Sequence, residues 1–179
     1  ALHTDQHSAL LYSASDISVW KTEKIEEHPF LQRLGPDILN PNLSWREVAE
    51  RLKSKAFAGR ALNSVYLDQA FLAGLGNYLR SEILFIAGIH PARRARELSK
   101  GEIGKLARAT LDVSQRSYAS QGVTIPDRQY KALKKKGISY GRARFFVFSR
   151  ANQPCRVCIT KIQRSNAYSR RSYPSATCQ

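Results

Sequence analysis

The chain has no methionine and no long hydrophobic run, and it holds only three cysteines among its 179 residues. Because an initiator methionine is absent, we expect a processed chain or a fragment. The longest apolar run, around Ile83 to Ile89, falls well short of the roughly 20 apolar residues that span a bilayer. The first residues lack the basic start and apolar stretch of a signal peptide. We therefore expect no membrane partner.

Acidic residues are scarce in the second part of the chain. Residues 1–75 hold 8 Lys/Arg and 9 Asp/Glu, whereas residues 76–179 hold 21 Lys/Arg and 5 Asp/Glu. The net charge is therefore −1 in the first segment and +16 in the second, within a total of +15. Such an excess indicates a polyanion partner, usually nucleic acid, because each neutralised phosphate releases a counterion. A merely solvated surface would mix its signs, as the first segment does.

Hydrophobic residues make up 42% of the chain, which is enough for a core and argues against global disorder. Serine followed three residues later by glutamate forms a capping box, and this pattern occurs at Ser44 and at Ser99. Apolar residues at helical spacing follow, and two further apolar runs flank a glycine-rich turn. The sequence predicts a mainly α fold with helices at 44–53, 66–72, 78–86 and 99–118, the third of them ended by His90-Pro91.

The remaining segments are less regular. Leu10 to Tyr12 predicts one strand, the tail of a sheet, and Arg144 to Phe148 predicts another that is rich in aromatic and β-branched residues. Residues 21–43 are rich in loops and prolines. Residues 121–142 carry many lysines without a clear period, so we expect a mobile basic loop, with an ordinary solvated loop as the alternative.

The turn Gly74-Leu75-Gly76-Asn77 lies between two of the expected helices. Glycine allows a positive φ and brings backbone N–H groups close to a partner, and asparagine is a good N-cap. A helix N-terminus with free N–H groups suits a phosphate. The charge excess begins at this turn, which favours a phosphate site at Gly76 and Asn77 over an ordinary turn between two core helices.

The three cysteines are close to a zinc-ligand pattern. Cys155 and Cys158 have the C-x-x-C spacing of one half of a zinc ribbon. In the second half Cys178 is kept, whereas Ser175 stands in place of a cysteine, and serine is a poor zinc ligand. The four histidines, at positions 3, 7, 28 and 90, are far away in the sequence. Structural zinc on three thiolates is one interpretation; two unpaired buried cysteines and a stray third are the other.

Four segments in register resemble the formamidopyrimidine-DNA glycosylase and endonuclease VIII family. Leu67 to Leu84, with Gly74-Leu75-Gly76-Asn77-Tyr78 and Glu82, is similar to its helix–two-turns–helix motif, and the segment from Pro154 to Gln179 is similar to its zinc finger. Two further segments, Leu11 to Asp16 and His28 to Asp37, are closer to the endonuclease VIII branch. The resemblance covers nearly the whole chain in the expected order.

The resemblance implies how the chain is divided. Residues 1–20 would be the remnant of an N-terminal β-sandwich and 21–43 a linker. Residues 44–142 would form the helical domain, with the basic loop at 121–142. Residues 143–179 would form a zinc-finger-like β-hairpin that holds one structural zinc ion.

The resemblance also implies base-excision repair of oxidised pyrimidines in double-stranded DNA. Family members evert the damaged nucleotide, excise its base and cut the abasic strand by β,δ-elimination. Their nucleophile is an N-terminal proline next to a glutamate, whereas this chain begins Ala1-Leu2, and the first sheet with its lysine is also missing. We therefore expect a DNA-binding fragment that cannot form the Schiff base. We also expect it to be a monomer, located in a reducing cytoplasm at the nucleoid.

Several site residues carry over by position. Asn77 matches an asparagine that contacts the DNA backbone, and Arg33 matches a DNA-binding arginine of the endonuclease VIII branch. Arg170 matches the finger arginine that grips phosphate and assists δ-elimination, with the neighbouring Arg171 as the alternative match. Arginine suits this role because its planar fork pairs with phosphate. The alternatives are a surface charge or salt bridge at Arg33 and a solvated charge at Arg170.

Two other interpretations compete with a glycosylase. Helix–two-turns–helix elements also occur in ribosomal-protein and topoisomerase families, where they bind nucleic acid without excising a base; the C-x-x-C tail argues against these families. A remnant that no longer folds well is the other, given the missing sheet and the lost cysteine ligand.

Overall fold

The computed structural model describes residues 1–12, 17–166 and 171–179. It divides into two units, residues 1–33 and residues 34–179. In the first unit, the short strands β1 (Leu2–His3) and β2 (Ser8–Ala9) pair antiparallel, with Leu2 opposite Ala9. Two 3-10 helices follow, η1 (Thr22–Glu27) and η2 (Leu31–Arg33). The strand expected at Leu10 to Tyr12 is wrong, because the paired residues come earlier.

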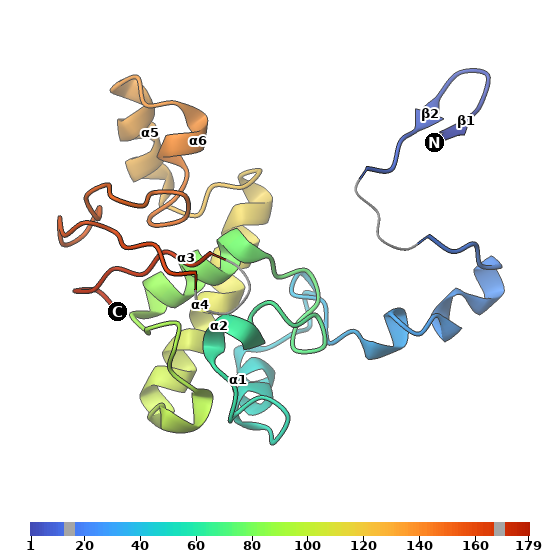
Figure 1. Cartoon of the computed structure of the whole chain (residues 1–179), viewed down its shortest axis with the longest axis horizontal. Helices are drawn as coiled ribbons and strands as arrows, with labels where there is room; N and C mark the ends of the chain where they lie inside the picture. Colours follow the sequence, from blue (N-terminus) through green and yellow to red (C-terminus); the bar gives the residue numbers. More distant parts are fainter. Residues whose placement is uncertain (13–16, 167–170) are drawn as a thin grey trace. The chain divides into compact units, whose positions relative to one another are not determined.

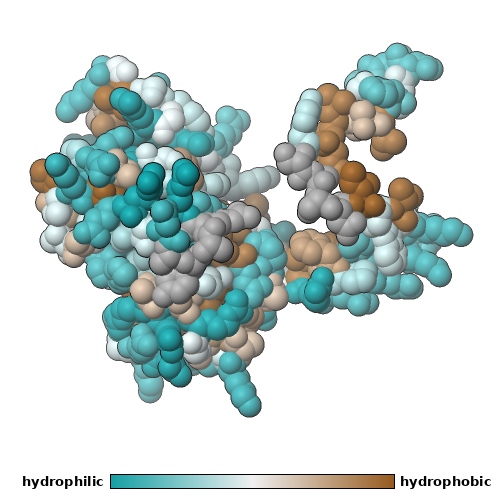
Figure 2. Space-filling model, in the orientation of Figure 1, coloured by the Kyte–Doolittle hydropathy of each residue, from teal (hydrophilic) through white to brown (hydrophobic). Residues whose placement is uncertain are grey.

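The first unit buries none of its described side chains. Figure 2 shows several hydrophobic side chains on its surface, and Val19, for example, is 98% exposed. Its aromatic contact is local: the rings of Trp20 and His28 meet edge to face at 5.0 Å, and Ser18 Oγ lies 3.3 Å from His28 Nε2. This unit is therefore held by short-range contacts rather than by a core.

Helices dominate the second unit (Figure 1). Both capping boxes are confirmed, since Ser44 Oγ accepts from the Glu47 N–H and Ser99 Oγ accepts from the Glu102 N–H. The helix expected over 66–72 is wrong, because those residues form turns after a shorter, earlier helix. The bounds are α1 (Trp45–Lys53), α2 (Leu62–Val65), α3 (Asn77–Ala87), η3 (Ala95–Glu97), α4 (Lys100–Ala119), α5 (Asp127–Lys135) and α6 (Tyr140–Ala143).

The main core lies where α4 packs against both α1 and α3. Helix α3 ends at Gly88, whose φ of +69° lets the chain reverse before His90-Pro91. The centre is closed by Tyr66, which is fully buried and shares a hydrogen bond of 2.7 Å with Thr110 Oγ1. Burial of these apolar faces fixes the direction of α3, and thereby of the turn that precedes it.

A second, smaller core joins α3 to the C-terminal segment. Phe85 of α3 packs there with Val147, Cys155, Ile162 and Tyr173. The segment pairs antiparallel at two bridges, Pro154 with Lys161 and Ser165 with Ser172. The described residues 155–166 and 171–178 therefore pair in a hairpin-like arrangement that packs on α3.

Two expectations about the connecting region are wrong. Residues 121–142 contain helices α5 and α6 rather than an irregular loop, and 144–148 is not a strand. Helix α5 has no fully buried residue, and its less exposed face is marked only by Tyr130 and Leu133, three positions apart, which is a short apolar pattern among many lysines. The backbone at Phe146 to Phe148 bends because its N–H groups point at Glu82 instead of at a neighbouring strand. Across the described ranges, no helix combines the length and the apolar character needed to cross a membrane.

Candidate nucleic-acid interface

The two glycines of the turn before α3 have different roles: Gly74 allows the turn conformation, and Gly76 leaves the backbone accessible. Gly74 has a φ of +91°, and an added Cβ would lie 3.1 Å from Ile38 Cγ2, so both conformation and space favour glycine. Gln69 fixes the turn, because its Oε1 accepts from the Gly74 N–H and its Nε2 donates to the Leu75 carbonyl, both at 2.9 Å. Gly76 is extended and has no atom within 4 Å of an added Cβ. A ligand can therefore approach the backbone at Gly76 closely.

Asn77 is the first residue of α3 rather than its cap. The N-cap is Gly76, which makes no side-chain capping bond, so the capping role expected for Asn77 is wrong. Its Oδ1 accepts from Arg80 Nη2 at 2.5 Å. This bond turns the amide so that Nδ2 is directed away from Arg80. Among the described residues no acceptor bonds to Nδ2, and this donor thus lies beside the free N–H groups of the first helical turn.

Arg80 connects the turn to the C-terminal segment. Its side chain is fully buried, and Nη2 also donates to the Arg171 carbonyl at 2.7 Å, while Nη1 donates to the Asn63 carbonyl at 3.2 Å. The structure therefore brings Asn77 and Arg171 together through one guanidinium. Sequence reasoning missed Arg80, although a single arginine within the apolar run from Tyr78 to Ile86 was the available signal.

The predicted DNA-binding arginines lie in two parts of the chain, Arg33 in the first unit and Arg170 and Arg171 towards the C-terminus. Arg171 is exposed, so its side chain is open to solvent while its carbonyl is held. Arg170 lies outside the described residues. Arg33 belongs to the first unit, where Nε donates to the Pro29 carbonyl at 3.0 Å, and its pairing with the turn stays a prediction.

Glu82 ties α3 to the segment that follows α5 and α6. Its carboxyl group is fully buried and accepts four hydrogen bonds, from the N–H groups of Phe146, Val147 and Phe148 at 2.8–2.9 Å and from Thr124 Oγ1 at 2.6 Å. Burial raises the pKa of Glu82, and the four donors oppose that shift. Its main role is to position this bend of the backbone against α3.

The three cysteines meet at one point. Cys155, Cys158 and Cys178 place their Sγ atoms within 4.8 Å of one another, with Cys155 and Cys178 at 3.9 Å. Sulfurs on a tetrahedral zinc ion are about 3.8 Å apart for a Zn–S bond of about 2.3 Å, so the cluster fits a metal. Ser175 Oγ lies 3.4 Å from Cys158 Sγ, next to the cluster.

The thiols of this cluster differ in acidity. Hydrogen bonds with Ser175 and Thr160 lower the pKa of Cys158 to about 6. Burial raises the pKa of Cys178 to about 11. Neither Cys158 nor Cys178 forms a disulfide, and a bound cation would favour the thiolate form of each.

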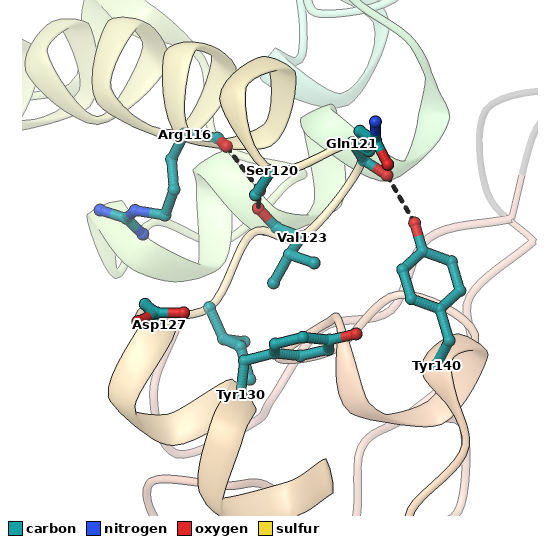
Figure 3. A pocket seen from close by; sticks show the side chains of 8 residues that line it. Arg116, Ser120, Gln121, Val123, Asp127, Tyr130 and Tyr140 are labelled. Carbon is teal, nitrogen blue, oxygen red and sulfur yellow. Dashed lines mark hydrogen bonds between the residues drawn. The ribbon is translucent and has the colours of Figure 1, made fainter.

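A cavity of about 350 Å³ lies between the last turn of α4 and helices α5 and α6 (Figure 3). Arg116 and Ser120 line its α4 side, and Tyr130 and Tyr140 line the opposite side. The Tyr140 hydroxyl donates to the Gln121 carbonyl at 2.5 Å, which joins the two walls. This end of α4 is also near the turn, because Ser117 Oγ and the Tyr78 hydroxyl are 3.1 Å apart. Sequence reasoning gave no sign of this cavity.

Helix α5 adds positive charge beside the cavity. The side chains of Lys131, Lys134, Lys135 and Lys136 lie along or just after it, and Lys131 is 70% exposed. Lys131 pairs with Asp127 at 2.7 Å, whereas the other three form no ion pair in the part of the chain that the structure describes. The charge predicted for a loop is therefore displayed on a helix.

Comparison with known proteins gives one consistent result. Residues 34–129 match the family model of the formamidopyrimidine-DNA glycosylase H2TH domain. The endonuclease 8 of Shigella sonnei (strain Ss046) is 43% identical over 178 residues, which are 99% of this chain and 64% of that protein. That of Escherichia coli O17:K52:H18 shows the same identity and coverage. The chain therefore spans less than two thirds of the length of the curated relatives it matches.

Solved structures agree in fold. The MutM (Fpg) protein of Thermus thermophilus has a TM-score of 0.71 and 30% identity, covering 90% of this chain and 59% of that one. The Lactococcus lactis Fpg, solved in complex with DNA containing an abasic site, has a TM-score of 0.70 at 22% identity, covering 88% and 56%. The mainly helical fold with a finger-like C-terminal segment is thereby confirmed.

Proposed function

The chain belongs to the formamidopyrimidine-DNA glycosylase and endonuclease VIII family, and we propose that it is the DNA-binding part of a repair glycosylase and abasic-site lyase for oxidised pyrimidines. The observation that carries this proposal is the buried Arg80, which holds Asn77 and the Arg171 backbone with a single guanidinium. Two predicted phosphate contacts from distant parts of the sequence thus sit on one buried support.

The chemistry of the turn suits a DNA backbone. The open backbone at Gly76, the Asn77 amide and the positive end of α3 all favour an anionic oxygen. Arg171 supplies an exposed cation from the other side of the Arg80 contact. Phosphate contacts of this kind fix the position of a duplex without reading its sequence, which is what a repair protein needs when damage occurs anywhere.

The cavity beside α4 supports the proposed glycosylase role, in which a damaged base leaves the duplex. An enzyme that acts on a base must take it out of the stack and hold it in a pocket. The cavity adjoins the end of α4 nearest the turn, and Tyr130 offers an aromatic face for stacking. Arg116 and the backbone at Gln121 supply polar groups at its edge. An everted base fits the size and chemistry of this cavity.

We propose that Cys155, Cys158 and Cys178 hold one structural zinc ion per chain. Such an ion supplies folding free energy to a segment too short for a core of its own. Held in place, the segment presents the exposed Arg171. By its match to the family, Arg170 is our proposed δ-elimination residue. Three free thiols require a reducing compartment, and a single chain supplies the turn and the finger together, so we propose a cytoplasmic monomer at the nucleoid.

Damage preference tests the proposed function. Fluorescence anisotropy would compare a duplex that carries one tetrahydrofuran abasic-site analogue with the same duplex undamaged. We expect binding to the damaged duplex to be at least about tenfold tighter, a modest preference beside the roughly 10³–10⁷-fold ratios of sequence-specific DNA-binding proteins. Asn77→Ala should weaken both, whereas Asn42→Ala, at an exposed asparagine of the same unit, should weaken neither. Equal affinity for the two duplexes would favour a general nucleic-acid-binding module.

A further inference from the structure

A groove between α1 and α4 lies away from the proposed DNA site. It has a volume of about 300 Å³, and Trp45 and Ala49 of α1 face Ile103 and Gly104 of α4 across it. Gly104 precedes Ser117, the α4 residue that contacts Tyr78, by thirteen positions, which is about 20 Å along a helix. The groove therefore needs an explanation of its own.

Trp45 is held in the groove by two guanidinium groups. The Cζ atoms of Arg46 and Arg108 lie 4.9 Å and 4.3 Å from the centre of its ring. Gly104 lies directly beneath this stack, because an added Cβ would come within 3.3 Å of Arg108 Nη2 and 3.8 Å of the Trp45 ring. Glycine inside a helix costs about 1 kcal/mol relative to alanine. A side chain larger than a methyl group at this position would extend into the groove, which Gly104 lines.

The rim of the groove is positively charged. Arg46, Lys53 and Lys100 line it, and Arg108 adjoins it, against a single lining acid, Glu50. Glu50 is bonded to Lys53 at 2.6 Å. The remaining cations surround an apolar floor, so the groove matches a ligand with carboxylates around an apolar anchor.

We propose that this groove binds an acidic peptide segment of a partner protein through one aromatic or aliphatic anchor side chain. A guanidinium stacked on an indole keeps its N–H edge free, and that edge pairs bidentately with a carboxylate. The anchor fills the apolar floor beside Trp45.

Nucleic acid fits the groove less well. A duplex presents phosphates on its outside, while its bases are stacked within, so it offers no apolar group for the floor. A single strand would stack its bases on an aromatic face, but two guanidiniums already lie over the Trp45 ring. An acidic peptide uses both the charge and the apolar floor.

The test uses a fluorescein-labelled peptide of four aspartates followed by phenylalanine, titrated with the full chain. We expect saturable binding, lost at least tenfold when alanine replaces the phenylalanine of the peptide. Gly104→Leu, which fills the groove, and Arg108→Ala should each weaken binding about tenfold. Arg128→Ala, at an exposed arginine of α5, is the matched control and should leave binding unchanged. Thermal melting would verify that each variant is folded.

Three results would overturn the proposal. One is the absence of saturable binding up to about 1 mM peptide. Another is a loss of peptide affinity with Arg128→Ala equal to that with Arg108→Ala, because the effect would then reflect net charge alone. The third is displacement of the peptide by a fifteen-residue oligothymidine whose own binding falls with Gly104→Leu, which would assign the groove to nucleic acid. Duplex affinity that is unchanged by Gly104→Leu would support a site separate from the DNA interface.

Discussion

Arg80 makes the turn and the C-terminal segment depend on each other. We predict that Arg80→Ala lowers the free energy of unfolding by about 2–4 kcal/mol, because one buried and two part-buried acceptors lose a charged donor. Among them are Asn77 Oδ1 and the Arg171 carbonyl. Duplex affinity should fall with it, since both phosphate contacts lose their support. Urea denaturation and anisotropy would measure the two effects. Arg80→Lys, which keeps the charge and loses the planar guanidinium, should have an intermediate free energy of unfolding and an intermediate duplex affinity. If Arg80→Ala changed neither quantity, the turn and the C-terminal segment would not depend on each other through Arg80.

Glu102 gives the stability a pH dependence of known sign. Its hydrogen bond with Arg93, followed by those with Ser99, lowers its pKa from 4.5 to about 2. A depressed folded-state pKa contributes stability that is present above pH 4.5 and is lost as the pH falls towards 2. Glu102→Gln should therefore destabilise the chain at pH 7 and converge with wild type near pH 2. Glu26→Gln in η1 is the control, and parallel curves for wild type and Glu102→Gln would contradict the assignment.

Single residues were predictable where one local rule governs them. Ser44 and Ser99 cap their helices as the sequence predicts, because the capping box involves only neighbouring residues. Gly74 likewise adopts the positive φ that its turn suggests. The partners of Arg80 were not predictable, since Asn63 and Arg171 are distant in sequence and only the tertiary fold brings them to it.

At the scale of elements, Glu82 anchors a bend that the sequence indicated as a strand. The aromatic and β-branched residues at 144–148 favour a strand, but their N–H groups find the Glu82 carboxyl group instead. We predict that Glu82→Gln lowers the unfolding free energy by about 1–3 kcal/mol, because an amide N–H₂ would face backbone donors. Chemical denaturation would measure this, with the exposed Glu50→Gln as control. Equal stability of the two variants would show that the bend needs no anchor.

The C-terminal segment depends on its cysteine cluster. Because it has only a small core on α3, we predict that a chelator lowers its melting temperature and weakens duplex binding, while the α1–α4 core stays helical by circular dichroism. With Co²⁺ as a probe, Ser175→Cys should raise the thiolate charge-transfer absorption by about one third, from three sulfur ligands to four. Ser172→Cys, outside the cluster, should not. An unchanged spectrum in Ser175→Cys would show that position 175 does not supply a ligand to the metal.

Helix α5 shows where sequence patterns stop being informative. It buries no residue completely, and its apolar face consists mainly of Tyr130 and Leu133, so the many lysines favoured a loop. Helices α1 and α4 were predictable because each carries both a cap and a buried apolar face. Boundaries inside the turn region were less so, since Tyr66 and Leu72 are buried by tertiary packing without being helical.

At the scale of the whole molecule, charge and order of segments predicted more than local pattern did. The excess of +16 over residues 76–179 was visible in composition, and the structure displays part of it on the lysines of α5. The cavity, the groove at Trp45 and the buried contacts of Arg80 and Glu82 arise from residues brought together by folding, and no pattern along the chain encodes them.

In our proposal, the turn at Gly76 and Asn77 binds the DNA backbone. The salt dependence of duplex binding is the sharpest test of this interaction. Anisotropy titrations of the folded chain with a duplex carrying the abasic-site analogue would be repeated between about 50 and 200 mM salt. We expect a linear plot of log K against log salt with a slope of about −5, as for roughly six phosphate contacts. Arg171→Ala should reduce that slope by about 1, and Asn77→Ala should lower affinity without changing it. Salt-independent binding, or no binding by a chain that circular dichroism shows to be folded, would contradict this ligand.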